Sequence, residues 1–294
     1  MRRETSLAGR IFDAFNYACL TLFALVTVLP FVNIVASSFA SEQEVLSREF
    51  ILFPTDFSLD AYRYIFSTNT LLRSLLVTVY ITIMGTFINI VCTSIMAYPL
   101  SRKDMIGRRW VMGMVLFTML FGGGLIPNYL LVKQLGMLNS LWSVMIPGAI
   151  GAFALIIIKN FFQQMPEGIE ESAKIDGCND LAILFRIVLP LSMPVIATFS
   201  LFFAVGHWNT FMSAVIYIND SAKWPIQVLL RSIVIMSNSQ FGDMGSVTDG
   251  ENMVIPPETV KMAVITVATV PILLVYPFLQ KHFAKGVLLG SVKG

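Results

Sequence analysis

The sequence predicts an all-α integral membrane protein with six transmembrane helices and both termini in the cytoplasm. Three observations predict this fold: a strongly apolar composition, six long gaps between charged residues, and a bias of basic residues toward one side of the membrane. Of the 294 residues, 56% are hydrophobic and 13% are charged, about half the charged share of a soluble domain. This composition excludes an ordinary soluble enzyme. The net charge of +2, without a basic run, gives no sign of nucleic-acid binding.

The six gaps contain no Asp, Glu, Lys or Arg, and each has at least 19 residues. A helix needs about 20 residues to cross a bilayer core. Buried helices of a soluble protein would need amphipathic partners around them, and little sequence remains to supply these. The expected helices of a single transmembrane domain, 1–294, are approximately residues 14–38, 74–98, 110–131, 140–162, 191–218 and 259–281.

The first helix follows three arginines, as a secretory signal would. Its uncharged run of 28 residues exceeds the roughly 7 to 15 of a signal's apolar region, so we expect an uncleaved anchor. In the outer loop 42–73, Asp60-Ala61-Tyr62 predicts a short amphipathic helix at the membrane surface. The outer loop 220–257 contains an apolar piece, 224–236, that is too short to span and is expected at the interface.

Glycines and prolines interrupt several of the expected helices. Such residues favour kinks and close helix contacts, although they are also commoner in membrane helices generally. They are Gly122-Gly123-Gly124 and Pro127 in the third helix, Pro147-Gly148 and Gly151 in the fourth, and Pro271 and Pro277 in the last.

Orientation follows from the basic residues. With both termini and the loops 102–109 and 159–186 on one side, that side carries 13 of the 20 Lys and Arg residues and the other carries 7. The side richer in basic residues is cytoplasmic. The dense cluster from Arg102 to Arg109 is therefore expected to anchor the topology.

Within the six uncharged runs, His207 is the one candidate for an ionisable side chain that could carry charge in the membrane. Transporters driven by protons or sodium and many channels place such groups in the membrane, so the sequence indicates another energy source. We expect His207 to be satisfied by a neighbouring helix. Cys19 and Cys92 fall in helices and Cys178 in a loop, a pattern that predicts neither a disulfide nor a metal site.

The cytoplasmic loop 163–190 predicts two short helices joined by a tight turn. Pro166 suits a first helical position, and Gly177 suits a left-handed exit from the first helix. Asn179 or Asp180 can cap the second helix. The first helix carries small residues on one face, which would allow another protein to approach closely, although such a helix pair is also a common plain connector.

Within this loop, Glu171-Ser172-Ala173, Gly177 and Ile187-x-Leu189-Pro190 have the spacing of a known motif. They resemble the EAA loop of ABC importer permeases, with Ser172 in place of the second alanine. In that family the loop forms coupling helices seated in a cleft of the ATPase subunit. The resemblance implies a type I ABC importer permease fold and an ATPase-coupling site formed by Glu170, Glu171, Ser172, Ala173, Asp176, Gly177, Ile187, Leu189 and Pro190.

Two further segments resemble the carbohydrate-uptake branch of this family. Trp208-Asn209 is similar to an element of the smaller maltose-importer permease, and residues 285–294 of the expected cytoplasmic tail, 282–294, are similar to the ending of permeases for complex or uronate-containing oligosaccharides. The resemblance implies a multi-pass protein of the bacterial cytoplasmic (inner) membrane. Its implied partners are a second permease, two ATPase subunits, an extracytoplasmic solute-binding protein, an oligosaccharide substrate and membrane lipid.

The chain has no Gly-x-x-x-x-Gly-Lys-Ser/Thr loop to hold phosphates. We therefore expect no enzymatic activity and no cofactor in this chain, with ATP and Mg bound by the partner ATPase. Asn128, Tyr129, Trp208 and Asn209 could bind sugar along a pathway by stacking and hydrogen bonding, or could serve as interface anchors and interhelical contacts. A secondary transporter or channel is the alternative, and a membrane-embedded enzyme would need a convergent catalytic cluster that the sequence lacks.

Overall fold

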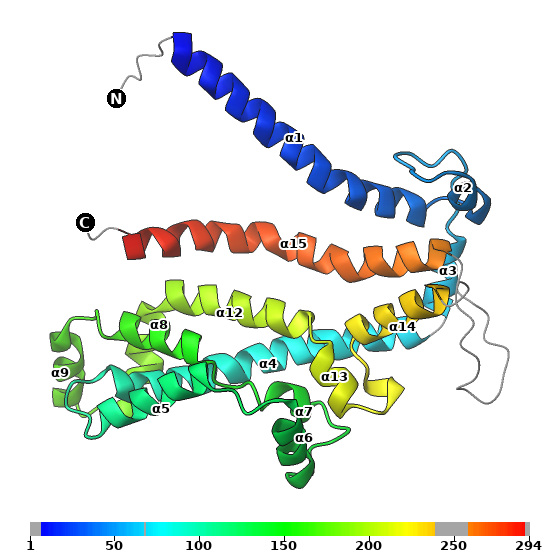
Figure 1. The fold of residues 1–294 in the computed structure, drawn as a ribbon. Helices are drawn as coiled ribbons and strands as arrows, with labels where there is room; N and C mark the ends of the chain where they lie inside the picture. Colours follow the sequence, from blue (N-terminus) through cyan, green and yellow to red (C-terminus); the bar gives the residue numbers. More distant parts are fainter. Residues whose placement is uncertain (1–6, 68, 239–257, 292–294) are drawn as a thin grey trace. The chain divides into compact units, whose positions relative to one another are not determined.

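The computed structural model describes residues 7–67, 69–238 and 258–291, which are built almost entirely from helices (Figure 1). In this part of the chain, the β contact is an isolated antiparallel bridge between Ala40 and Phe57. The helices are α1 Leu7–Ser38, α2 Glu42–Ser47, α3 Asp60–Ser67, α4 Asn69–Ser101, α5 Arg108–Leu120, α6 Leu125–Gln134, α7 Trp142–Met145, α8 Ala152–Phe162, α9 Glu167–Ile175, α10 Asp180–Ile183, the π-helical turn η1 Leu184–Val188, α11 Leu189–Leu191, α12 Met193–Trp208, α13 Met212–Tyr217, the 3₁₀ turn η2 Ser221–Lys223, α14 Ile226–Asn238 and α15 Glu258–Ser291.

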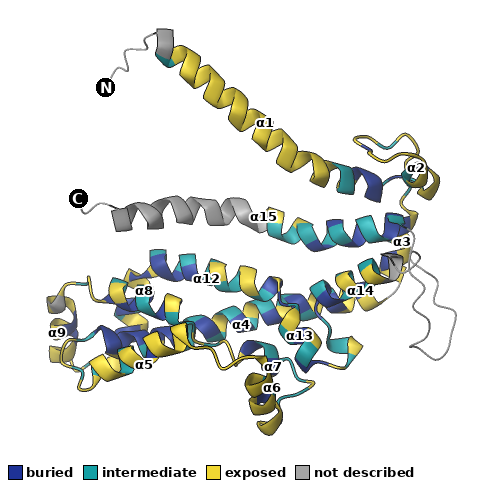
Figure 2. Ribbon diagram, in the orientation of Figure 1, coloured by how far each residue is buried: buried dark blue, intermediate teal, exposed yellow. Residues whose placement is uncertain are grey.

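Helix α1 exposes apolar side chains around most of its length (Figure 2). Every residue from Arg10 to Val32 is exposed, and Phe12 and Phe23 are 67% and 70% exposed. A helix that is apolar on every side requires lipid or another protein around it. Burial begins only at the end of α1, where Ala36, Ser37 and Ser38 are covered.

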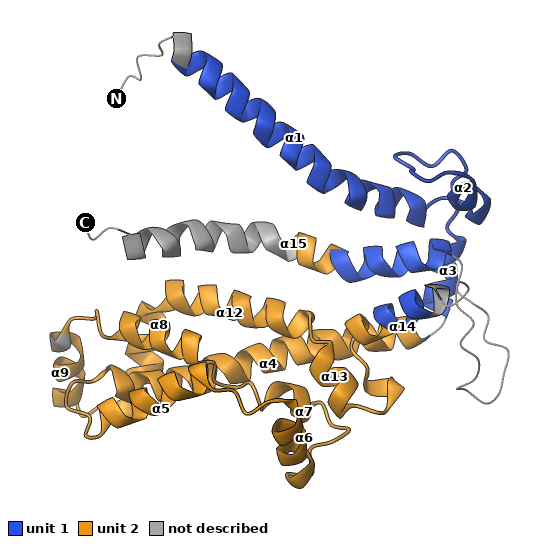
Figure 3. Ribbon diagram, in the orientation of Figure 1, with its two compact units in different colours: residues 1–69, 230–269 blue, residues 70–229, 270–294 orange. Residues whose placement is uncertain are grey.

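The chain divides into two compact units, which subdivide the single domain expected from the sequence (Figure 3). Unit 1 comprises residues 1–69 and 230–269, and unit 2 comprises residues 70–229 and 270–294. Within unit 1, Phe39 stacks between Phe57 and Tyr62, with ring centroids 5.6 and 4.8 Å away. The predicted short helix of the outer loop is α3, which buries Ala61 and Ile65 on one face.

Unit 2 contains the larger apolar core. The core joins the end of α4 to α5, α8 and α12 and also takes in the helices of the loop 163–190. Its buried members are Ala97, Tyr98, Leu100, Val115, Ala154, Leu155, Ile158, Phe162, Ala173, Ile183, Leu184, Val188, Val195, Ile196 and Phe199. The loop is thus packed onto the helix ends and is part of the same body.

The third and fourth expected helices are each broken in the structure. α5 and α6 meet at an angle of 117° across residues 121–124, where Gly124 has φ +82°. The segment expected as 140–162 consists of the short α7, a non-helical stretch around Pro147, and α8. Glycine permits the positive φ, and proline removes a backbone donor, so the regular hydrogen-bond ladder stops at these positions.

The expected helix 191–218 is also divided. Asp180–Leu191 and Met193–Trp208 meet at 87°, and a second break at residues 209–211 separates α12 from α13. A proline ring clashes with the carbonyl four residues earlier. Pro190 therefore disturbs the turn around Arg186, where η1 lies, and Pro194 disturbs the turn at Pro190, just before the break at Ser192.

Among the described residues, Gly9–Ser38 and Asn69–Ser101 are single helices long and apolar enough to cross a membrane. Counting each of the two bent pairs as one crossing raises the number to four. α15 contains the expected sixth helix, 259–281, and continues to Ser291 through most of the expected tail, 282–294. The count of six remains a prediction.

Candidate functional site

The turn between α9 and α10 has a defined hydrogen-bond pattern. Gly177 has φ +81°, and its N–H donates to the Lys174 carbonyl at 3.0 Å, while the Cys178 N–H donates to the Ala173 carbonyl at 3.0 Å. These two bonds form a Schellman motif, in which glycine relieves the strain of the left-handed residue. Asn179 then caps α10, because its Oδ1 accepts the Ala182 N–H at 2.7 Å. The predicted left-handed turn and cap are confirmed.

Pro166 lies one position earlier than predicted. It occupies the N-cap of α9 with φ −59° and ψ 129°, and the helix begins at Glu167. Residues 163–166 and 176–179, on either side of α9, are not helical. α9 is therefore a short helix held between two non-helical connections.

The residues expected in the ATPase-coupling site are divided between two faces of the loop. Ala173 is buried in the core of unit 2, and Ile187 and Leu189 are partly buried against that core. The residues exposed to solvent are Glu171, Ser172, Asp176, Gly177 and Pro190. The loop thus has an anchoring face and an open face.

The open face also presents two apolar side chains that the sequence reading did not single out. Ile175 is 86% exposed at the end of α9, and Leu181 is 61% exposed on α10. Apolar side chains displayed on both sides of the Gly177 turn are typical of a surface that another protein covers. Their signal in the sequence was weak, since helical periodicity over so few residues does not separate a buried face from an open one.

Glu170 lies on the anchoring face and is 8% exposed. Its carboxylate forms an ion pair with the Arg102 guanidinium, which follows the end of α4. The Arg102 Cζ atom lies 4.6 Å from the centroid of the Tyr98 ring, within cation–π distance. Burial raises the pKa of the Glu170 carboxyl, and the Arg102 charge opposes that shift. Arg102, expected only as a topology anchor, is therefore also a contact of the loop.

The four residues expected along a sugar pathway fall into different environments. Asn128 is exposed on α6, and the adjacent Tyr129 stacks on Tyr217 of α13 at 6.3 Å between ring centroids. Asn209 is exposed, donates to the Val205 carbonyl at 2.8 Å and accepts from Gln227 at 3.4 Å. Trp208 is only 9% exposed, so of the four it offers the least surface for stacking.

His207 is held by a neighbouring helix, as the sequence predicts. Its Nε2 lies 2.6 Å from Asn89 Oδ1 on α4. The Asn89 amide in turn donates to the carbonyls of Gly148 and Ala149, at 2.7 and 3.1 Å, in the break before α8. Asn89 therefore supplies a hydrogen-bond donor to backbone carbonyls that have no helical partner in this break. Among the described residues, no group of three His, Cys, Asp or Glu side chains is placed to hold a metal ion.

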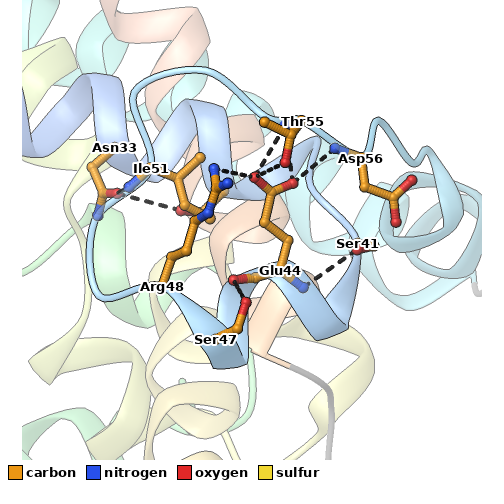
Figure 4. Close-up of polar contacts among 9 residues, drawn as sticks. Asn33, Ser41, Glu44, Ser47, Arg48, Ile51, Thr55 and Asp56 are labelled. Carbon is orange, nitrogen blue, oxygen red and sulfur yellow. Dashed lines mark hydrogen bonds and ion pairs between the residues drawn. The ribbon is translucent and has the colours of Figure 1, made fainter.

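A polar cluster in unit 1 folds the loop that follows α1 (Figure 4). The Glu44 carboxylate accepts the backbone N–H groups of Thr55 and Asp56 at 2.9–3.0 Å and the Thr55 hydroxyl at 2.7 Å, and it pairs with Arg48 at 3.0 Å. Asn33 Oδ1 accepts the Ile51 N–H at 2.7 Å. The hydrogen bonds from the Asp56 and Thr55 N–H groups lower the pKa of Glu44 to about 2.

Beside this cluster lies an open cavity of about 700 Å³ within unit 1. Three carboxylates, those of Glu42, Asp56 and Asp60, line it together with Arg63 and the aromatic rings of Phe57 and Tyr64. Arg63 pairs with Asp60 at 3.4 Å. The loop thus forms a folded surface with a net acidic hollow.

Comparison with known proteins agrees with this geometry. A family model described as "Binding-protein-dependent transport system inner membrane component" matches residues 2–289. The polygalacturonan/rhamnogalacturonan transport system permease protein YtcP of Bacillus subtilis (strain 168) is 61% identical over 289 residues, covering 98% of this chain and 100% of that protein. Protein LplC of the same bacterium is 54% identical over 290 residues, covering 98% and 96%.

A solved structure is similar over nearly the whole chain. It is described as the crystal structure of a bacterial ABC transporter involved in the import of the acidic polysaccharide alginate. One of its chains is 30% identical, has a TM-score of 0.85, and is matched over 95% of this chain and 98% of that chain. The fold is therefore that of an ABC importer permease.

These observations define the class as a helical membrane protein in which the loop 163–190 forms two short helices packed onto the helix ends. The chain belongs to the family of binding-protein-dependent transport system inner membrane components, and it is the permease component of an ABC importer for sugars or oligosaccharides.

Proposed function

We propose that this permease imports uronate-containing oligosaccharides. The support is the similarity to the polygalacturonan/rhamnogalacturonan permease YtcP, which is 61% identical over the full length of that protein, and the structural match to an importer of the acidic polysaccharide alginate. Asn128 and Asn209, exposed on α6 and after α12, are the candidate hydrogen-bonding residues of the pathway. Tyr129 with Tyr217 is the candidate stacking surface.

The geometry of α9 and α10 carries the coupling role. The Schellman turn at Gly177 fixes the two helices relative to each other, the buried Ala173 anchors them, and Ile175 stands 86% exposed at the tip. In our proposal the open face docks into a cleft of an ATPase subunit, with Glu171, Ser172 and Asp176 around the apolar tip. Leu189 and Pro190 connect this face to α12.

We propose six transmembrane segments with both termini in the cytoplasm of a bacterial cell and the loops 42–73 and 220–257 outside. The bias of 13 to 7 in basic residues supports this orientation. The two continuous helices and two bent pairs supply four of the segments. The segment of α7 and α8 and helix α15 supply the remaining two. Residues 239–257 of the second outer loop lie outside the described part of the chain.

The proposed assembly contains a second permease, two ATPase subunits and an extracytoplasmic solute-binding protein. Exposed apolar residues on α1 support contact with lipid and with the second permease. The folded surface around Glu44 supports contact with the solute-binding protein. ATP and Mg bind to the ATPase subunits, and closure of these subunits, transmitted through the loop 163–190, exposes the pathway alternately to the two sides.

Reconstitution into proteoliposomes tests this function. The full assembly should take up a digalacturonate that its binding protein delivers, with dependence on ATP and none on a proton gradient. The neutral digalactoside of equal length is the matched control and should be taken up poorly. The purified single chain should neither hydrolyse ATP nor transport. Uptake by the single chain that a protonophore abolishes would instead support a secondary transporter.

A further inference from the structure

Helix α9 is held to the rest of the permease by side-chain contacts as well as by the backbone connections on its two sides. Non-helical residues flank α9 on both sides, so a force on α9 could turn the helix about these connections without moving the membrane helices. Besides the burial of Ala173, a polar contact from the end of α4 opposes such rotation. There, Arg102 pairs with Glu170 near the start of α9.

This ion pair is largely shielded from water. The Arg102 and Glu170 side chains are 20% and 10% exposed, and Tyr98, which lies under the guanidinium, is 7% exposed. Shielded charges are screened little by salt, and removing one partner leaves the other charge buried without compensation. The three side chains therefore hold α9 against α4 as one unit.

A second ion pair in the same loop provides a contrast. Lys174 and Asp180 lie 3.7 Å apart and are 54% and 71% exposed. An exposed pair of this kind contributes little, because water and salt screen it. The pair joins α9 to α10.

Helix α4 is hydrogen-bonded to three other elements of unit 2. Asn89 of α4 bonds the break before α8 and His207 of α12. Thr78 of α4 accepts the Ile226 N–H at 2.8 Å, at the start of α14. A displacement that reaches the end of α4 is thus delivered to three other elements.

We propose that Arg102 and Glu170, with Tyr98, form a positioning latch that transmits motion of the docked helix α9 directly to α4. The proposal deepens the function proposed above and rests on it. Arg102 and Glu170 act here through α9 and α4 and contact neither substrate nor nucleotide. Loss of the latch leaves the open face of α9 available for docking, so the expected defect is in coupling.

A double-mutant cycle in the reconstituted importer tests the latch. The variants are Arg102→Gln, Glu170→Gln and the double variant, and the readouts are ATPase retention on purification, ATP hydrolysis, and ATP consumed per molecule imported. Each single variant should retain the ATPase and raise the ATP consumed per molecule imported by about tenfold, the ratio that corresponds to about 1.4 kcal/mol. The double variant should be no worse than the poorer single variant, because the two residues act as one unit.

Two further variants keep the test decisive. Arg102→Lys keeps the charge and should recover most of the coupling, whereas a residue with only a packing role would not respond to charge. The matched control, Lys174→Gln with Asp180→Asn, should leave the ratio unchanged. Wild-type ratios in assembled Glu170→Gln importers, or single effects that multiply in the double variant, would overturn the latch. A wild-type assembly that fails to couple ATP to uptake would overturn the proposed function instead.

Discussion

Replacement of Gly177 by valine tests how far coupling depends on the turn between α9 and α10. Gly177 has φ +81°, and a Cβ atom added there meets nothing within 4 Å. The Cβ atom itself therefore causes no clash, and the backbone strain is about 1–2 kcal/mol for an L-residue in the left-handed region and more for a β-branched one. Strain of this size reduces the population of the native turn roughly 5- to 30-fold.

The assay measures retention of the ATPase subunits and the ATP consumed per molecule imported, in importers purified from membranes. Gly177→Val should insert normally, because the membrane helices are unchanged, and should weaken docking or uncouple hydrolysis from import. Gly177→Asn should be tolerated, since asparagine enters the left-handed region more readily. Gly168→Val is the matched control, because Gly168 lies within α9 and also has open space around it. Wild-type docking and coupling in Gly177→Val would refute the role of this turn.

Three further predictions concern other parts of the chain. Gly85→Ala places a Cβ atom 2.5 Å from the His207 ring and should lower the stability of the permease by about 1–3 kcal/mol through overpacking. Thermal unfolding measures this loss of stability, and the control Gly113→Ala, which has open space at the added atom, should show no loss. The loop 42–56 should resist pepsin in proteoliposomes near pH 4.5 and lose this protection as the pH falls toward about 2, because Glu44 has a pKa of about 2 against an ordinary 4.5 and stabilises the loop only while ionised. At pH 4.5, pepsin should cut the Glu44→Gln variant readily and the Glu42→Gln variant no faster than the wild type. Equal protection of all three proteins would contradict this role of Glu44. In a chain without its native cysteines, a membrane-impermeant reagent applied to spheroplasts should label a cysteine at position 219 and not one at 104, and the opposite pattern would reverse the orientation.

Local signals in the sequence predicted the local structure of the loop well. Gly177 and Asn179 were correct as turn and cap because capping depends on the chemistry of a few adjacent residues. The short helix α3 and the partner for His207 were likewise anticipated. Pro166 was displaced by one position, as proline is compatible with both the N-cap and the first turn of a helix.

Contacts between distant segments could not be predicted. Arg102 and Glu170 are separated by α5, α6, α7 and α8, and their pairing depends on how these helices pack. Asn89 carried a weak signal, since an asparagine in an apolar helix commonly bonds another helix. Nothing in the sequence specified that its partners would be the carbonyls of Gly148 and Ala149.

The breaks in the helices were only partly anticipated. The glycines at 122–124 and Pro127 marked the third helix as interrupted, and the structure has a bend of 117° between α5 and α6. A hydropathy pattern gives the length of an apolar run but does not show whether the chain bends within it. The sequence therefore predicted α5 and α6 as one transmembrane segment. The break at Ser192 reflects the combined effect of Pro190 and Pro194, whereas the sequence predicted one continuous helix over residues 191–218.

The bend at Ser192 converts one direction of motion into another. The segment Asp180–Leu191 meets α12 at 87°, so a displacement along the axis of this segment pushes the start of α12 sideways. A helix that is pushed sideways at one end tilts. The 16 residues of α12 extend about 24 Å, so a tilt of about 10° moves the far end by about 4 Å. His207 lies at that far end, so such a tilt strains its bond to Asn89.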